Sequence, residues 1–212
     1  MELKRETLRL YAVTDRAWLN GRTLDGQVED VIRGGAGIVQ LREKALDDAA
    51  FLAEAQRIVP LCRALGAVSI INDRVDIALA SGADGVHVGQ EDMAAARARA
   101  ALGPDRLVGV SVHNVDEALA AQAAGADYLG VGAAFASHTK AEARPLTREV
   151  IRAVTRAVRI PVVAIGGITA ENILELSGCG LAGVAVVSAL FAQPDAKAAA
   201  RRMLALSQAL DG

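Results

Sequence analysis

The segment Gln40-Leu-Arg-Glu-Lys44 ends an apolar run and places an amide and two cations at alternate positions. Side chains of a β-strand alternate between its two faces, so Gln40, Arg42 and Lys44 are expected to point the same way. A forked guanidinium and an ammonium group can together neutralise the oxygens of a phosphate. This face therefore predicts an anion site, with a salt-bridged rim that includes Glu43 as the alternative.

Two acidic residues, Asp73 and Asp92, stand at the ends of neighbouring apolar runs. If both runs are adjacent parallel strands, two carboxylates lie beside the cations, an arrangement that is costly unless a cation sits between them. Mg²⁺ held by carboxylates and substrate phosphates meets that need. Asp76 and Glu91 are close enough in sequence to be alternative ligands. Helix capping, or pairing with Arg74, is the purely structural interpretation.

The residues that follow the remaining apolar runs include hydroxyl side chains and glycines. A long connection over residues 132–145 supplies Ser137, Thr139 and Lys140, and it could close over a ligand as a lid, with a solvated loop as the alternative. The pair Gly166-Gly167 permits close backbone approach, and amides there and at the start of the next helix can hold a phosphate. Together with the cationic face, this pattern predicts two separate phosphate positions.

These residues all lie where apolar runs end, so the pattern also predicts the elements that position them. Eight apolar runs indicate parallel strands buried on both faces, at residues 8–14, 38–44, 68–73, 85–89, 107–112, 128–132, 161–167 and 183–189. Helical segments are expected at 23–33, 47–65, 74–81, 93–102, 114–124, 147–158, 169–177 and 194–210, with candidate N-caps at Thr23, Asp47, Asn114 and Thr169.

Eight strand-then-helix units predict an α/β fold, a closed (β/α)₈ TIM barrel that forms a single catalytic domain over residues 1–212. An open doubly wound sheet is the second choice. In such a barrel the chemistry gathers at the carboxyl ends of the strands, which is where the residues above stand.

Composition bears on partners and location. A net charge of −2 lacks the basic excess that would hold a nucleic acid, and no run is apolar for the roughly 18 residues of a membrane span. The start of the chain lacks the apolar stretch of a signal peptide. Cys62 and Cys179 are expected to be buried, reduced thiols, which places the protein in the cytoplasm. The oligomeric state stays open, and a homo-oligomer is compatible with the sequence.

The three histidines are interpreted as structural residues unless a functional partner is evident. His87 alternates with valines inside a predicted strand, which favours a hydrogen-bonded core histidine over a catalytic base. His113 and His138 stand at a strand end and in a loop, and no carboxylate partner is evident for either at motif spacing.

In order along nearly the whole chain, the segments 40–44, 71–73, 85–92, 109–111, 139–140, 165–168 and 187–188 resemble the thiamine phosphate synthase family. The resemblance implies a TIM barrel that joins a hydroxymethylpyrimidine diphosphate to a thiazole phosphate, releases pyrophosphate and uses Mg²⁺. Its partners are then small molecules. The family mechanism is dissociative: diphosphate leaves, the aminopyrimidine stabilises a methylene cation, and the thiazole nitrogen attacks it.

The resemblance also implies roles for individual residues. Asp73 and Asp92 would bind Mg²⁺, and Arg42, Lys44, Ser111 and Lys140 would be the catalytic set. Substrate contacts would come from Gln40, Leu41, Arg42, Glu43, Lys44, Asn72, Ser111, Ser137, His138, Thr139, Lys140, Gly167, Val187 and Ser188. Within this set Gln40 would contact the pyrimidine, while Gly167, Val187 and Ser188, with the loop hydroxyls, would hold the thiazole phosphate.

Three positions depart from the family pattern: Ala133 replaces a proline, Ser137 replaces a threonine, and Thr147 stands where a glycine is usual. None of the changes removes a charged group. Two alternatives remain, a related thiazole tautomerase and a non-catalytic sensor of thiazole phosphate. Neither would need the full diphosphate and Mg²⁺ set that this chain carries.

Overall fold

The computed structural model describes residues 3–19, 21–89, 95–136 and 145–211. Eight parallel strands form a closed ring in chain order, and β1 pairs with β8. The strands are β1 (Leu10–Val13), β2 (Ile38–Leu41), β3 (Val68–Asn72), β4 (Gly85–Val88), β5 (Leu107–Val112), β6 (Tyr128–Gly132), β7 (Val162–Ile165) and β8 (Gly183–Val186). This closure confirms the TIM barrel and excludes the open sheet.

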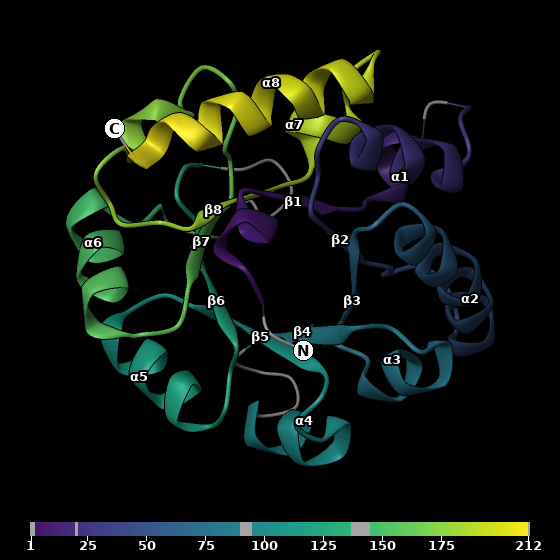
Figure 1. Cartoon of the computed structure of the whole chain (residues 1–212), viewed down its shortest axis with the longest axis horizontal. Coiled ribbons are helices and arrows are strands. Elements are labelled where there is room, and N and C mark those ends of the chain that lie inside the picture. The colour runs from purple at the N-terminus through teal and green to yellow at the C-terminus, as the bar shows by residue number, and fades with distance from the viewer. Residues whose placement is uncertain (1–2, 20, 90–94, 137–144, 212) are drawn as a thin grey trace.

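Helices surround the ring of strands (Figure 1). The α-helices are α1 (Leu24–Arg33), α2 (Asp48–Ala64), α3 (Val75–Ser81), α4 (Ala95–Leu102), α5 (Val115–Ala123), α6 (Arg148–Ala157), α7 (Ser188–Phe191) and α8 (Ala196–Gln208). Short 3₁₀ turns are η1 (Arg5–Leu8), η2 (Arg16–Trp18), η3 (Ile173–Leu176) and η4 (Ala209–Asp211). No helix in these described ranges is long and apolar enough to cross a membrane.

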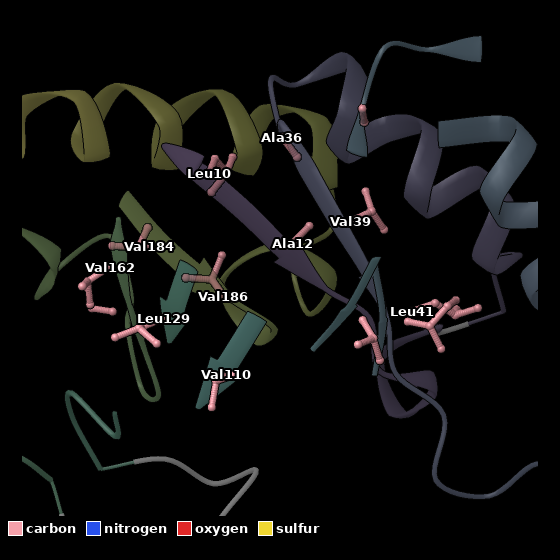
Figure 2. Close-up of a cluster of buried hydrophobic side chains, with 14 of the residues drawn as sticks. Leu10, Ala12, Ala36, Val39, Leu41, Val110, Leu129, Val162, Val184 and Val186 are labelled. Carbon is pink, nitrogen blue, oxygen red and sulfur yellow. The ribbon is translucent and has the colours of Figure 1, made fainter. Parts of the chain in front are cut away.

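Strand side chains divide between two hydrophobic cores, as alternation requires. Leu10, Ala12 and Val39 belong to the outer core between strands and helices, part of which Figure 2 shows. Tyr11 and Ile38 belong to a smaller core that contains no α-helical residue and fills the barrel interior. Burial on both faces explains why the strands read as continuous apolar runs.

Local capping confirms three predicted helix starts. The side chains of Thr23, Asp47 and Asn114 each accept a hydrogen bond from the backbone N–H three residues on, which satisfies one of the donors that a helix start leaves unpaired. The predicted helix at 169–177 is wrong, because only the 3₁₀ turn η3 forms there. Asn172 Nδ2 instead donates to the carbonyl of Gly167, and Asn172 Oδ1 accepts from Thr169 N.

Three strands end two or three residues earlier than predicted. β2 ends at Leu41, and the next amide, of Arg42, donates to Thr14 Oγ1 rather than along the ladder. β7 ends at Ile165, where Gly166 and Gly167 adopt positive φ values of 98° and 64° and turn the chain away. β8 ends at Val186, and α7 begins two residues later at Ser188. Each shortening moves predicted site residues out of the sheet.

Candidate active site

A pocket opens at the carboxyl ends of the strands. The predicted site residues that line it are Gln40, Arg42, Asn72, Ser111, Gly167, Val187 and Ser188. They come from β2, β3 and β5 on one wall and from the segments after β7 and β8 on the other. Ser137, His138, Thr139, Lys140 and Asp92 lie outside the described residues.

The segment after β2 does not present all its polar side chains to the pocket. Gln40 and Arg42 line it, and Arg42 Nη1 lies 3.7 Å from Asp15 Oδ2. Lys44 is exposed and does not line the pocket. The prediction that Gln40, Arg42 and Lys44 all point the same way is therefore wrong for Lys44. The reason is the end of β2 at Leu41, after which strict alternation no longer holds. The Leu41 side chain lies in the outer core.

Glu43 points away from the pocket into a buried ionic cluster. Arg16 Nε donates to Glu43 Oε2 over 2.8 Å, and the same guanidinium also pairs with Glu54. Within the described residues, Glu43 Oε1 and Glu54 Oε2 are buried without a hydrogen-bond partner. Burial and the neighbouring Glu54 carboxylate raise the pKa of Glu43 to about 7. Glu43 thus forms a salt bridge, as in the alternative interpretation of this segment, and its partner is Arg16.

The carboxylate of Asp73 stands directly after β3, beside the pocket residue Asn72. Asp73 has φ 62°, a left-handed conformation in which Asp and Asn are the commonest non-glycine residues. Its Oδ2 accepts a hydrogen bond of 2.5 Å from Asn72 Nδ2. Strained backbone of this kind persists where the surrounding structure enforces it, often at ligand sites. Arg74 pairs with Asp48 and Asp76, which leaves Asp76 engaged in an ion pair.

The donor set at this end of the barrel suits a hard cation that also binds phosphate. Within the part of the chain described, no three His, Cys, Asp or Glu side chains come together as a cage. Mg²⁺ is usually bound by one or two carboxylates plus substrate phosphates, so one oriented carboxylate next to an anion pocket fits it.

His87 is a hydrogen-bonded core residue, as predicted, and it also reaches the pocket. The residue is 7 % exposed, it lines the pocket, and its Nε2 lies 2.9 Å from Ser111 Oγ. His113 has a carboxylate partner that was not expected from the sequence: its Nδ1 lies 2.9 Å from Glu117 Oε2. The i, i+4 spacing across the start of α5 was the signal that could have revealed this pair.

The glycine pair after β7 accommodates protein backbone. A Cβ atom on Gly167 would stand 2.3 Å from the carbonyl oxygen of Ala136 and 2.7 Å from that of Phe135. A Cβ on Gly166 would meet the Cβ of Ala133 at 2.7 Å. The glycines therefore let the segment after β6 pack against the segment after β7, at the edge of the pocket. The phosphate site expected at the N-terminus of the next helix does not form, because no α-helix forms over residues 169–177.

Two tyrosines were missed by reasoning from the sequence. Tyr11 and Tyr128 lie inside the barrel, with their hydroxyl oxygens 2.8 Å apart. The available signal was a tyrosine inside a buried strand, since a buried phenol needs a hydrogen-bond partner.

Comparison with known proteins places this geometry in a family. A model of the family described as thiamine monophosphate synthase matches residues 10–190. The chain is 47 % identical over 195 residues to a thiamine-phosphate synthase of Ruminiclostridium cellulolyticum, covering 92 % of this chain and 93 % of that protein. It is 49 % identical to that of Chloroflexus aurantiacus, covering 93 % and 92 %.

A solved structure supports the same conclusion. The thiamine phosphate pyrophosphorylase from Pyrococcus furiosus superposes with a TM-score of 0.89 at 36 % identity, covering 98 % of this chain and 99 % of that one. Profile, full-length identity and fold agree, and the chain belongs to the thiamine monophosphate synthase family.

Proposed function

We propose that this chain joins 4-amino-2-methyl-5-hydroxymethylpyrimidine diphosphate to 4-methyl-5-(2-phosphoethyl)thiazole, giving thiamine phosphate and pyrophosphate. The observation that carries the proposal is one pocket with two polar walls, formed by Arg42, Asn72 and Ser111 on one side and by Gly167 and Ser188 on the other. Two walls suit two anionic substrates that must meet in one cavity.

The pyrimidine diphosphate belongs on the wall formed by β2, β3 and β5. Gln40 contacts the ring, and Arg42, Asn72 and Ser111 hold the diphosphate together with Lys140. Lys44, whose side chain is exposed outside the pocket, joins them by turning toward the bound diphosphate. Leu41 and Glu43, whose side chains face the outer core and the Arg16 cluster, contribute through their backbone. The thiazole phosphate belongs beside Gly167, Val187 and Ser188, with Ser137, His138 and Thr139 from the neighbouring loop.

The reaction proceeds by departure of the diphosphate before attack. The bond between the methylene carbon and the diphosphate oxygen breaks, and its electron pair leaves on the pyrophosphate. The ring amino group donates electron density to the resulting methylene cation, and the lone pair of the thiazole nitrogen forms the new carbon–nitrogen bond. Arg42, Lys44 and Lys140 stabilise the negative charge that develops on the leaving group, and no protein nucleophile is required.

Asp73 and Asp92 are the residues that would hold Mg²⁺. Bound Mg²⁺ supplies charge neutralisation on the pyrophosphate oxygens as the bond breaks. Asn72 fixes the Asp73 carboxylate through its hydrogen bond and so orients one ligand oxygen in advance.

The biological setting follows from the chemistry. The substrates are small molecules, nucleic acid is not a partner, and the two buried free cysteines suit the cytoplasm. A homo-oligomer is compatible with this function.

The experiment combines purified protein, both substrates and Mg²⁺, and measures pyrophosphate. A synthase releases pyrophosphate only when both substrates are present. A tautomerase would isomerise the thiazole phosphate alone, and a sensor would bind it without any product. Either of those two results, without pyrophosphate, refutes the proposal.

A further inference from the structure

Five polar side chains form one hydrogen-bonded path through the barrel interior. Gln40 Nε2 donates to Tyr11 Oη over 2.7 Å, and Tyr11 Oη lies 2.8 Å from Tyr128 Oη. Tyr128 Oη lies 3.2 Å from His87 Nδ1, and His87 Nε2 lies 2.9 Å from Ser111 Oγ. The path thus joins two pocket-lining residues on different strands, Gln40 on β2 and Ser111 on β5.

Every member of this path except Ser111 is buried, so the hydrogen bonds of the buried members are obligatory. Tyr11 and Tyr128 are 1 % and 0 % exposed, and Gln40 is 3 % exposed. Burial raises the pKa of both tyrosines above the usual range, so both phenols keep their protons at neutral pH. A buried donor left without an acceptor costs the full desolvation of that group.

Counting protons gives the path a direction. The Tyr11 oxygen accepts from Gln40, and among the described residues Tyr128 is the remaining partner for the Tyr11 hydrogen. Tyr11 therefore donates to Tyr128, and Tyr128 donates to His87 Nδ1. His87 then carries its proton on Nε2 and donates to Ser111 Oγ. With the Gln40 amide nitrogen directed at Tyr11, the opposite direction would leave the buried Tyr11 hydrogen without an acceptor.

Two small residues on the neighbouring strands make room for the path. A Cβ atom on Gly109 would stand 2.1 Å from Tyr128 Cζ and 2.5 Å from His87 Nδ1. A Cβ on Gly130 would stand 3.2 Å from His87 Cε1. Rigid aromatic rings could not give way to the first of these contacts, so Gly109 is required for the tyrosine and the histidine to meet.

We propose that Tyr11 is a positioning residue that holds the nitrogen end of the Gln40 amide, so that the oxygen end faces the pocket and selects the 4-amino group of the pyrimidine. The ring nitrogens and the diphosphate of that substrate are acceptors, and its amino group is the N–H donor. A fixed acceptor can pair only with that group. This inference rests on the proposed function, which supplies the aminopyrimidine.

The same hydrogen bond helps the reaction. As the methylene cation forms, the amino nitrogen gives electron density to the ring and its N–H becomes a stronger donor. A carbonyl oxygen already aimed at it binds the transition state more tightly than the ground state. Loss of the Tyr11 hydroxyl therefore lowers kcat as well as selectivity.

The test compares the aminopyrimidine diphosphate with its 4-oxo analogue, which presents an acceptor where the substrate has a donor. The ratio of kcat/KM for the two compounds is measured in wild type and in Tyr11→Phe. The ratio is expected to fall by about 10-fold or more, because the Gln40 amide is then free to turn its nitrogen to the pocket.

Ser207→Ala is the matched control, since it also removes a fully buried hydroxyl, one that donates to the Arg9 carbonyl away from the pocket. It should lower thermal stability and leave the selectivity ratio as in wild type. Tyr128→Phe is a second variant, which removes the acceptor of the Tyr11 proton and should lower the ratio in the same direction.

The outcomes separate the two proposals. An unchanged ratio in both tyrosine variants overturns the positioning role, whatever happens to stability. A ratio that falls equally in Ser207→Ala also overturns it, because the effect would then be general loosening. A wild-type enzyme that releases no pyrophosphate from either compound refutes the proposed function instead.

Discussion

Consecutive residues after β2 meet entirely different surroundings. Arg42 lines the pocket and lies near Asp15, whereas the next side chain, Glu43, is buried against Arg16. Lys44 is exposed. This short segment is anchored to the body of the protein through Glu43 while Arg42 lines the pocket, so the position of the Arg42 guanidinium depends on a carboxylate that points away from the pocket.

The Glu43 cluster predicts a pH-dependent stability. The folded-state pKa of Glu43, about 7, lies above its unfolded value near 4.5, so the folded protein holds this proton more tightly. This stabilisation is complete below about pH 4.5 and is lost as the pH rises through 7. The Glu43→Gln variant has no group that titrates at this position, so it does not lose this stabilisation. The free energy of unfolding of the variant minus that of wild type should therefore increase as the pH rises from about 4.5 through 7. Denaturant titrations at several pH values measure the difference, and a constant difference would contradict the pKa shift.

Asp73→Asn tests the proposed Mg²⁺ ligand without disturbing the backbone, because Asn also tolerates the left-handed conformation at φ 62°. We expect kcat/KM to fall by roughly 10²-fold and the Mg²⁺ concentration for half-maximal activity to rise. Asp76→Asn is the control, since it removes the same charge from an exposed carboxylate paired with Arg74. The ligand assignment fails if Asp76→Asn raises the Mg²⁺ requirement and Asp73→Asn does not.

The βα connections of this barrel are built against one another. Phe135 N donates to the Gly166 carbonyl over 3.0 Å, and Leu146 N donates to the Ala133 carbonyl over 2.7 Å. The Ala133 side chain occupies the space that a Cβ atom on Gly166 would need. The wall proposed for the thiazole phosphate is therefore shared between two connections, and a change in either one should move both.

Gly167→Ala tests this shared wall. The new Cβ would collide with two backbone carbonyls, so we expect the KM for thiazole phosphate to rise more than the KM for the pyrimidine diphosphate. Gly178→Ala is the matched control, because Gly178 has a similar φ of 71° with open space around it. The control should lose about 1 kcal/mol of stability and keep normal kinetics. Steady-state assays of both variants decide, and equal KM changes for the two substrates would argue against separate walls.

The positions of the strands could be predicted from the sequence, because burial on both faces requires continuous apolar runs. The geometry of the loops could not. The helix expected at 169–177 depended on composition, but the side chain of Asn172 bonds the Gly167 backbone and the chain turns instead. The tyrosine pair joins residues 117 positions apart, and no local pattern encodes a contact across the barrel. Candidate pocket residues were found because a TIM barrel gathers its strand ends in one place.

At the scale of the whole molecule, the principal core lies between the strands and the helices. Leu129 on β6 is fully buried there, while Leu119 on α5 is 43 % exposed. Leu129→Ala should lower the free energy of unfolding by about 2–5 kcal/mol through lost burial and a cavity. Leu119→Ala should change it by no more than about 0.5 kcal/mol. Denaturant unfolding measures the free energy of unfolding of both variants. Similar losses in the two variants would mean that the outer core between strands and helices is not the main source of stability.

The claim that one pocket joins two phosphorylated substrates is tested most directly by a single turnover. Enzyme in excess is mixed with a limiting amount of the pyrimidine diphosphate, saturating thiazole phosphate and Mg²⁺, and the quenched reaction is analysed by mass spectrometry. If both substrates react in this pocket, thiamine phosphate and pyrophosphate appear together, in equal amounts and at the same rate. Consumption of the pyrimidine diphosphate without thiamine phosphate, or conversion of the thiazole phosphate alone, would contradict it.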